Sequence, residues 1–298
     1  MNLRNVCVGL LLLIVPMGHA ATRKGYIPVS AGARIYYEER GEGTPLILLH
    51  GHSLDTRMWN KQFKAFSRRW RVVRFDFRGY GRSSEQREDV QFTHLADLLT
   101  VMDSLHIGKA YVVGLSMGAF VASDMLAMAP ERMLGCVLAS GGLKTYKGPS
   151  QPMDSVEKAK RDIEIAALKA KGVDRMKQEW LDALVGSGGT RRETMRRPLK
   201  KMIAKWPAWQ PLHYEPRVMV AGDAVERFKS QCTRVPVLFL VGGAELKGRQ
   251  PSRPWMMQYL PESRLQVVHD AGHMMNMEQP EAFNEAVTEF IGSLPAEK

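Results

Sequence analysis

Residues 110–121 read Ala-Tyr-Val-Val-Gly-Leu-Ser-Met-Gly-Ala-Phe-Val, so that Ser116 stands between two glycines directly after an apolar, β-branched run. The run at 110–113 has the length and composition of a buried parallel strand. The apolar stretch at 117–129, which Pro130 ends, predicts a helix. Ser116 is therefore expected at a tight turn that leads from a strand into a helix.

The two glycines of this stretch, Gly114 and Gly118, lie two residues before and two residues after Ser116. A turn this tight brings the end of the strand close to the start of the helix and leaves no room for large side chains at these positions. The serine is then forced outward, and the unpaired N–H groups of the first helical turn favour a developing anion. Residues 114–118 thus have the pattern of a nucleophile elbow, the turn that presents a catalytic serine.

With this elbow in its context of strand and helix, the chain resembles the α/β-hydrolase family from about Lys24 to the C-terminus. The resemblance implies an α/β fold with a mostly parallel, eight-stranded sheet flanked by helices. It also implies a hydrolase core domain made of residues 24–143 and 235–298, with a helical cap inserted at residues 144–234.

The predicted cap contains no strand-like run, and its helices are expected to be broken at Gly186-Ser187-Gly188-Gly189, Pro198, Pro207 and Pro211. On its first helix, one face would present Met176, Trp180 and Leu184, which we expect to pack on the sheet or to line the pocket. Parallel α/β sheets bind ligands beyond the carboxyl ends of their strands, so an insertion here would cover the serine.

The other two catalytic residues follow from the resemblance. The family places its acid after the strand predicted at 235–242, usually as aspartate, and this chain has Glu245 there. The catalytic histidine is expected after the last strand, in Asp270-Ala271-Gly272-His273. Ser116, Glu245 and His273 then occur in the order serine, acid, histidine that this fold uses.

Each of these two assignments has alternatives nearby in the sequence. His269 precedes His273 by four residues, near the end of the last strand, where its side chain is expected to face the sheet or a flanking helix. The carboxylates that compete with Glu245 are Asp76, Asp154 and Asp270. Asp76 comes before the serine, the wrong place for the acid, and is expected to order its own loop. Asp270 is expected to shape the loop of the histidine.

The resemblance also implies that the backbone N–H groups of His52 and Met117 bind the oxyanion. His52 belongs to His50-Gly51-His52, which follows an apolar strand, and Gly51 would let the backbone turn sharply there. Because both donors are backbone groups, we interpret the imidazoles of His50 and His52 as loop packing or pocket wall rather than as acid–base groups. The implied chemistry needs no cofactor and no metal.

The N-terminal segment has Arg4 before an apolar run at 6–17, followed by Gly18-His19-Ala20. This pattern is typical of a secretory signal peptide, and the run is shorter than the roughly 20 residues that cross a bilayer. Residues 1–20 are therefore predicted to be cleaved near Ala20, leaving an exported, periplasmic or secreted protein without stable membrane insertion. Of the two remaining cysteines, Cys136 is expected in the core, and its pairing with Cys232 stays open.

The chain is basic, with 42 lysines and arginines against 31 aspartates and glutamates. The predicted cap alone holds 20 against 11. Either this charge marks a solvated helix face, or it attracts an anionic substrate or an anionic surface. Nucleic acid is not expected, because the chain has no binding motif for it and no interleaved aromatic groove. The densest basic run is Arg191, Arg192, Arg196, Arg197, Lys200 and Lys201.

These patterns predict an exported serine hydrolase that cleaves a small-molecule carboxylic ester or lactone through an acyl-enzyme on Ser116. A carbon–carbon bond hydrolase of the same fold uses the same triad and remains an alternative. A ligand-binding protein that keeps the pocket and has low turnover is a second alternative. Dehalogenases and epoxide hydrolases of this fold carry an aspartate at the elbow, so the serine disfavours them.

Overall fold

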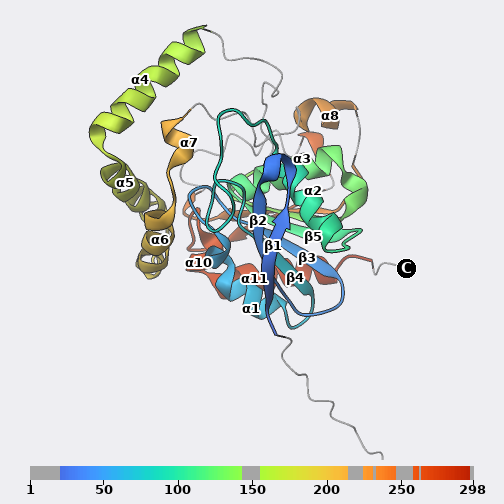
Figure 1. Cartoon of the computed structure of the whole chain (residues 1–298). Coiled ribbons are helices and arrows are strands. Elements are labelled where there is room, and N and C mark those ends of the chain that lie inside the picture. Colours follow the sequence, from blue (N-terminus) through green and yellow to red (C-terminus); the bar gives the residue numbers. More distant parts are fainter. Residues whose placement is uncertain are drawn as a thin grey trace, which may run out of the picture.

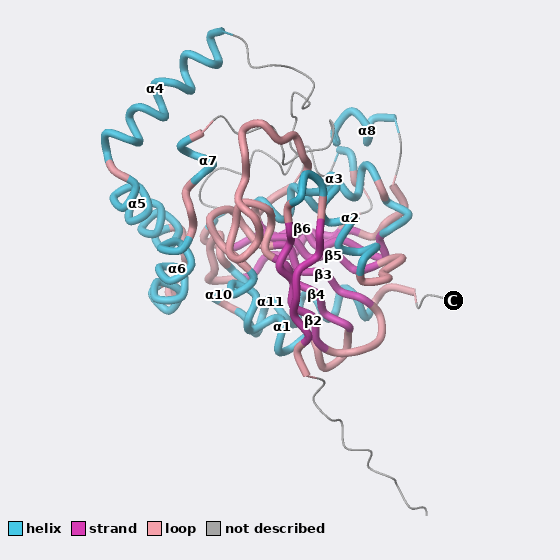
Figure 2. Tube along the Cα trace, viewed as in Figure 1, coloured by secondary structure: helices cyan, strands magenta, loops and turns pink. Residues whose placement is uncertain are grey.

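The structure is a computed structural model that describes residues 21–142, 155–213, 224–230, 233–245, 258–261 and 263–295. A single eight-stranded sheet lies at its centre, with the strand order β1-β2-β4-β3-β5-β6-β7-β8 (Figures 1 and 2). β1 and β4 each pair antiparallel with β2, and the remaining described pairings are parallel. The predicted fold class is thereby confirmed. The strands are β1 (Arg23–Pro28), β2 (Arg34–Arg40), β3 (Pro45–Leu49), β4 (Arg71–Phe75), β5 (Ala110–Leu115), β6 (Met133–Ala139), β7 (Val237–Gly242) and β8 (Arg264–Val268).

Helices cover both faces of this sheet, as a buried parallel sheet requires. On β3, Ile47 and Leu49 face one apolar layer, while Leu46 and Leu48 face the other. The first layer includes α2 (His94–Ser104) and α3 (Met117–Met128), and the second includes α1 (Asn60–Phe66) and α11 (Pro280–Gly292). Cys136 on β6 is a free thiol and is fully buried, which confirms its place in the core. Burial raises the pKa of this thiol. Cys232, whose pairing with Cys136 the sequence leaves open, lies outside the described residues.

Between β6 and β7 the chain forms what we call the helical insertion, whose described parts are residues 155–213 and 224–230. Neither part contains a strand, as the sequence predicts. Figure 1 shows α4 to α7 together on one side of the molecule, with α4 reaching away from the sheet. The predicted boundary at 143–144 and the predicted signal peptide at 1–20 lie outside the described residues. The helices are α4 (Ser155–Lys171), α5 (Val173–Gly186), α6 (Glu193–Lys205), α7 (Trp209–Leu212) and α8 (Ala224–Ser230).

Three expectations about the insertion are wrong, and two of them concern α5 and α6. The apolar face of Met176, Trp180 and Leu184 belongs to α5, the second described helix of the insertion, because α4 precedes it. Pro198 does not break a helix but lies inside α6. An interior proline costs about 3 kcal/mol, and the burial of one face of α6 outweighs that cost. The buried residues of this face are Met195, Leu199, Met202 and Ile203.

The other breaks in the insertion follow the sequence more closely. α5 ends at Gly186, where the glycine-rich run begins, and α6 ends two residues before Pro207. Pro211, however, does not break a helix, which is the third wrong expectation. It lies in the first turn of α7, where a backbone N–H would have no partner within the helix. No helix in the described part of the chain has the length and apolar composition that crossing a membrane requires.

Candidate active site

Ser116 lies between β5 and α3, at the predicted turn. Its backbone has φ 56° and ψ −115°, a conformation that residues other than glycine rarely adopt. A Cβ atom at Gly114 would lie 2.2 Å from the carbonyl oxygen of Gly118, and a Cβ atom at Gly118 would lie 2.1 Å from that of Leu49. The two glycines therefore allow the elbow to close, which leaves Ser116 partly exposed at its apex.

Glu245 and His273 meet at the carboxyl ends of the last two strands. Nδ1 of His273 lies 2.9 Å from Oε1 of Glu245, and the side chains are 24% and 23% exposed. Burial alone would raise the pKa of Glu245, but hydrogen bonds from His273 and Ser140 and the charge of His273 hold it below its usual value. Because an ionised carboxylate can only accept, Nδ1 of His273 carries the proton of this hydrogen bond.

The competing carboxylates have other partners. Asp76 is fully buried and accepts hydrogen bonds from the backbone N–H groups of Thr56 (2.7 Å) and Arg82 (2.9 Å), which confirms that it orders its loop. Asp270 is exposed and accepts from the backbone N–H of Thr190 at 2.8 Å. Asp154 lies outside the described residues.

His269 is placed differently from the expectation. Its side chain is exposed rather than turned toward the sheet or a helix, because β8 ends at Val268 and His269 already belongs to the following turn. Among the described residues, it forms no hydrogen bond through its ring.

Of the two predicted oxyanion donors, Met117 lies in the elbow and His52 lies in the loop after β3. Among the described residues, no acceptor is present for the backbone N–H of His52 or of Met117, which opens α3. The loop of His52 lies against the elbow, since a Cβ atom at Gly51 would come within 3.6 Å of the Cβ of Ser116. The carbonyl of Gly51 accepts the backbone N–H of Leu54 at 3.3 Å, so the chain turns here as expected, and the positive φ of this turn occurs at Ser53 (64°).

The two imidazoles of this loop are packing groups, as expected. Nε2 of His50 accepts the backbone N–H of Phe77 at 2.9 Å, so Nδ1 carries the proton and donates to the carbonyl of Gly51 at 2.8 Å. Nδ1 of His52 lies 2.8 Å from the hydroxyl of Tyr80. Burial lowers the pKa of both rings, that of His52 to about 4, so both are neutral at pH 7.

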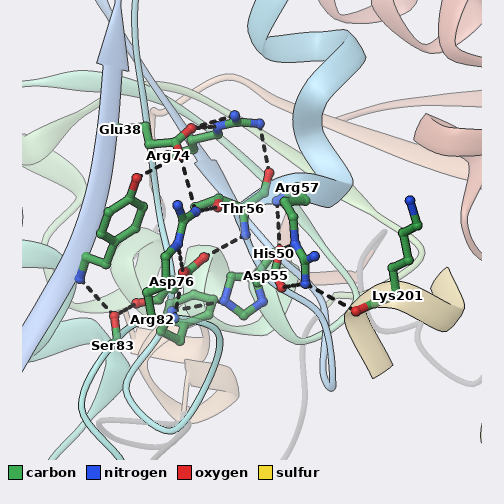
Figure 3. Close-up of polar contacts among 12 residues, drawn as sticks. Glu38, His50, Asp55, Thr56, Arg57, Arg74, Asp76, Arg82, Ser83 and Lys201 are labelled. Carbon is green, nitrogen blue, oxygen red and sulfur yellow. Dashed lines mark hydrogen bonds and ion pairs between the residues drawn. The ribbon is translucent and has the colours of Figure 1, made fainter. Parts of the chain in front are cut away.

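Buried ion pairs support the loop that carries His52 (Figure 3). Arg74 on β4 donates to the carboxylate of Glu38 at 2.9 Å and to the carbonyl of Thr56 at 2.9 Å. Arg82 donates to the hydroxyl of Thr56 at 2.8 Å. Removing one partner of a buried pair leaves an uncompensated charge, which costs about 3–5 kcal/mol. This network therefore holds the chain around Thr56, four residues beyond His52, in one position.

A model of the alpha/beta hydrolase family matches residues 46–286 of the sequence. The chain belongs to the alpha/beta hydrolase family. The match extends from β3 into α11, so it includes the elbow and the loops of Glu245 and His273. The resemblance inferred from the elbow is confirmed.

Curated and solved relatives cover this hydrolase along most of its length. The 3-oxoadipate enol-lactonase 1 of Acinetobacter baylyi is 26% identical over 85% of this chain and 91% of its own. The pimeloyl-[acyl-carrier protein] methyl ester esterase of Nitrosomonas europaea is 25% identical over 84% and 97%. The solved structure of a thermophilic esterase from Thermogutta terrifontis superposes with a TM-score of 0.71 at 23% identity, covering 91% of this chain and 98% of that one, which shows a shared fold.

The contacts of the helical insertion with the loop of His52 were not predicted. Nε1 of Trp180 on α5 donates to the hydroxyl of Ser53 at 2.6 Å, and the rings of Trp206 and His52 lie 4.9 Å apart. Trp180 belongs to the apolar face that the sequence does reveal, whereas nothing in the sequence singles out Trp206. The insertion thus forms one wall beside the elbow.

A second unpredicted contact joins the insertion to the loop of His273. A Cβ atom at Gly272 would lie 1.9 Å from the carbonyl oxygen of Ser187, and one at Gly189 would lie 2.5 Å from that of Asp270. Thr190 and Asp270 are hydrogen-bonded beside these contacts. The turn after α5 and the histidine loop therefore pack backbone to backbone, which only glycines permit.

Ser140 is another residue whose place in the site the sequence does not reveal. It follows β6 with φ 45°, and its hydroxyl donates to Oε2 of Glu245 at 2.6 Å. A serine after a strand carries no signal of such a role, and only the fold brings it to Glu245.

Proposed function

We propose that this hydrolase is a serine hydrolase that cleaves a small-molecule carboxylic ester or lactone through an acyl-enzyme on Ser116. The observation that carries the proposal is the hydrogen-bonded pair of Glu245 and His273. This pair lies at the carboxyl ends of the strands, as does the strained elbow that holds Ser116. A serine hydroxyl is a poor nucleophile without an adjacent base, and an oriented neutral histidine is the base that such enzymes use.

In the proposed mechanism, Nε2 of His273 takes the proton of Ser116 as its oxygen attacks the substrate carbonyl. Glu245 keeps His273 in the tautomer with Nε2 unprotonated and stabilises the imidazolium that forms. The backbone N–H groups of His52 and Met117 bind the oxyanion of the tetrahedral intermediate. His273 then protonates the leaving group. In the second half of the reaction, water takes the place of Ser116 as the nucleophile and hydrolyses the acyl-enzyme, and His273 again acts first as base and then as acid.

Two of the reported relatives support the cleavage of an ester or a lactone. Their names include an enol-lactonase and a methyl ester esterase, both of which align with this chain over more than 80% of its length. A lactone is a cyclic ester, so one acyl-enzyme mechanism serves both substrates.

An anionic substrate is a further part of the proposal, supported by charge. Residues 155–213 of the insertion hold 14 lysines and arginines against 7 aspartates and glutamates. Arg197, Lys200 and Lys201 on α6 are exposed. The lactonase relative is named for 3-oxoadipate, a dicarboxylate, which fits the basic charge of the insertion.

Export is proposed from the signal-peptide pattern at residues 1–20. Expression of the full chain with a C-terminal tag, followed by fractionation and mass spectrometry, tests this. We expect a periplasmic or secreted protein that begins at Ala21, and an intact N-terminus in the cytoplasm would reject export.

The deciding experiment is labelling with a fluorophosphonate, followed by a panel of esters, lactones and vinylogous diketones. We expect the label on Ser116 and a loss of at least about 10³-fold in kcat in Ser116→Ala, because triad residues act as a unit. Ser123→Ala is the matched control, since that buried hydroxyl donates to the carbonyl of Ala119 within α3 at 2.9 Å.

Three results would contradict the proposal. Undiminished ester hydrolysis by Ser116→Ala would exclude the serine mechanism. Turnover of vinylogous diketones alone would indicate carbon–carbon bond cleavage. Negligible turnover by the wild type, with ligand-induced stabilisation that survives Ser116→Ala, would indicate a binding protein.

A further inference from the structure

We propose that Ser140 is a positioning residue that fixes the carboxylate of Glu245, an inference that rests on the proposed serine mechanism. The two oxygens of this carboxylate have different partners. Oε1 lies 2.9 Å from Nδ1 of His273, and Oε2 accepts the hydroxyl of Ser140 at 2.6 Å. Ser140 therefore acts on His273 only through Glu245.

A glutamate needs such an anchor more than an aspartate does. Its longer side chain has an additional torsion, and its terminal torsion is broad, so the carboxylate can rotate away from a single partner. A hydroxyl that holds Oε2 leaves Oε1 directed at His273. The hydroxyl can donate and a carboxylate can only accept, so this bond also favours the ionised form of Glu245, whose pKa is lowered.

The turn after β6 is itself held at several points. The backbone N–H of Ser140 donates to the carbonyl of Leu240 on β7 at 3.0 Å. The preceding carbonyl, of Ala139, accepts the backbone N–H of Ser116 at 2.9 Å. A Cβ atom at Gly141 would lie 2.7 Å from the carbonyl oxygen of Ser116. One turn thus contacts both the backbone of the elbow and the side chain of the acid.

The positive φ of Ser140 supplies a way to separate its hydroxyl from its backbone. Glycine adopts a φ of 45° without strain, so Ser140→Gly removes the hydroxyl and relieves the backbone. Ser140→Ala removes the hydroxyl and keeps the strain. Ser140→Asn keeps a donor, since asparagine tolerates positive φ and its amide can donate to Oε2.

The experiment measures kcat and KM on the best substrate of the panel. We expect kcat to fall about 10- to 100-fold in both Ser140→Ala and Ser140→Gly, the range of one hydrogen bond to a charged group, with little change in KM. Ser140→Asn should recover part of the loss, and Ser123→Ala should match the wild type.

A double-mutant cycle then tests whether Ser140 acts through Glu245. In a Glu245→Gln background, Ser140→Ala should cost less than twofold, because no carboxylate remains to be positioned. An equal loss in both backgrounds would show that Ser140 supports the elbow instead, and unchanged kcat in Ser140→Ala and Ser140→Gly would overturn the proposal outright.

A readout without substrate keeps this inference separate from the proposed function. At low pH the proton on Nδ1 of His273 should give a low-field NMR resonance, assigned by its loss in His273→Ala. We expect Ser140→Ala to shift or broaden it and Ser123→Ala to leave it unchanged. If the wild type hydrolyses nothing, the proposed function fails, while this resonance still decides whether Ser140 positions Glu245.

Discussion

At the residue scale, the carboxylates of this hydrolase differ in their hydrogen-bond partners. Among the described residues, Asp76 accepts hydrogen bonds from Thr56 and Arg82, whereas Glu245 accepts from His273 and is partly exposed. Among the described residues, Glu245 is the carboxylate that is hydrogen-bonded to His273.

Glu245→Gln should lower kcat by about 10³- to 10⁴-fold with little effect on KM, because an amide favours the wrong tautomer of His273 and no longer balances its charge. Glu245→Asp should retain part of the activity. Steady-state kinetics on folded variants, with folding checked by circular dichroism, measures both. Near-normal kcat in Glu245→Gln, with collapse in Asp76→Asn, would move the acid to Asp76.

His94 on α2 is a residue whose burial has a cost. It is fully buried among aromatic rings, and neither ring nitrogen has a hydrogen-bond partner among the described residues. Burial, followed by the nearby His50 and Arg78, lowers its pKa to about 3. Between pH 6.5 and about 3 the unfolded chain binds a proton that the folded protein does not, so stability falls as pH drops through this window.

His94→Leu should therefore stabilise the protein, and more so in acid. We expect a gain of about 1–3 kcal/mol at pH 8, where two unsatisfied nitrogens are removed. At pH 5 the gain should grow by about 2 kcal/mol, because the variant no longer takes up that proton on unfolding. Urea unfolding at both pH values measures this, and a gain that is equal at pH 5 and pH 8 would contradict the pKa argument.

At the element scale, the sheet was predictable and the insertion only in part. Strands such as β3 and β5 are short apolar runs bounded by turns, and both faces are buried, so the pattern alone identifies them. The elbow has its own glycines as a signal. The helices of the insertion follow burial against distant segments, which a local pattern does not contain, so Pro198 was misread as a break.

Within the site, the same distinction holds. Ser116 and the loop of His273 are recognisable from contiguous residues. Ser140 contacts Glu245 in the turn after β7, and Trp206 contacts His52, and each of these partners is far away in the sequence. Such pairings depend on the register of the strands and on packing, which no short motif encodes.

Pro198→Ala tests the energetics of α6. An alanine restores the backbone N–H that the helix lacks at this position, so we expect stabilisation of about 1–3 kcal/mol. Hydrogen exchange should show slower exchange confined to α6 and its neighbour α5. Faster exchange in α6 would mean that the ring of Pro198 makes packing contacts worth more than the missing hydrogen bond.

At the scale of the whole molecule, charge is unevenly distributed. The insertion is strongly basic, while Glu38 and Glu39 on β2 are paired with arginines of the core. The field of exposed basic side chains acts over a distance that salt controls, from about 10 Å at 0.1 M to about 3 Å at 1 M.

An anionic ester should therefore lose kcat/KM as salt rises from about 0.1 M to 1 M, whereas its neutral analogue should not. Arg197→Glu with Lys200→Glu should lower kcat/KM for the anionic ester at low salt and remove its salt dependence. If a rise in salt lowered kcat/KM equally for the anionic ester and its neutral analogue, the charged face of α6 would be only a solvated surface.

The backbone contact between the turn after α5 and the histidine loop limits how this hydrolase can be recombined with its relatives. Residues 187–190 and 270–272 lie about eighty positions apart in the chain but interlock through glycines and through Thr190 and Asp270. An insertion grafted from a relative would bring only one half of this joint. Exchanging substrate specificity by grafting therefore requires that both segments travel together, since a mismatched turn would displace His273.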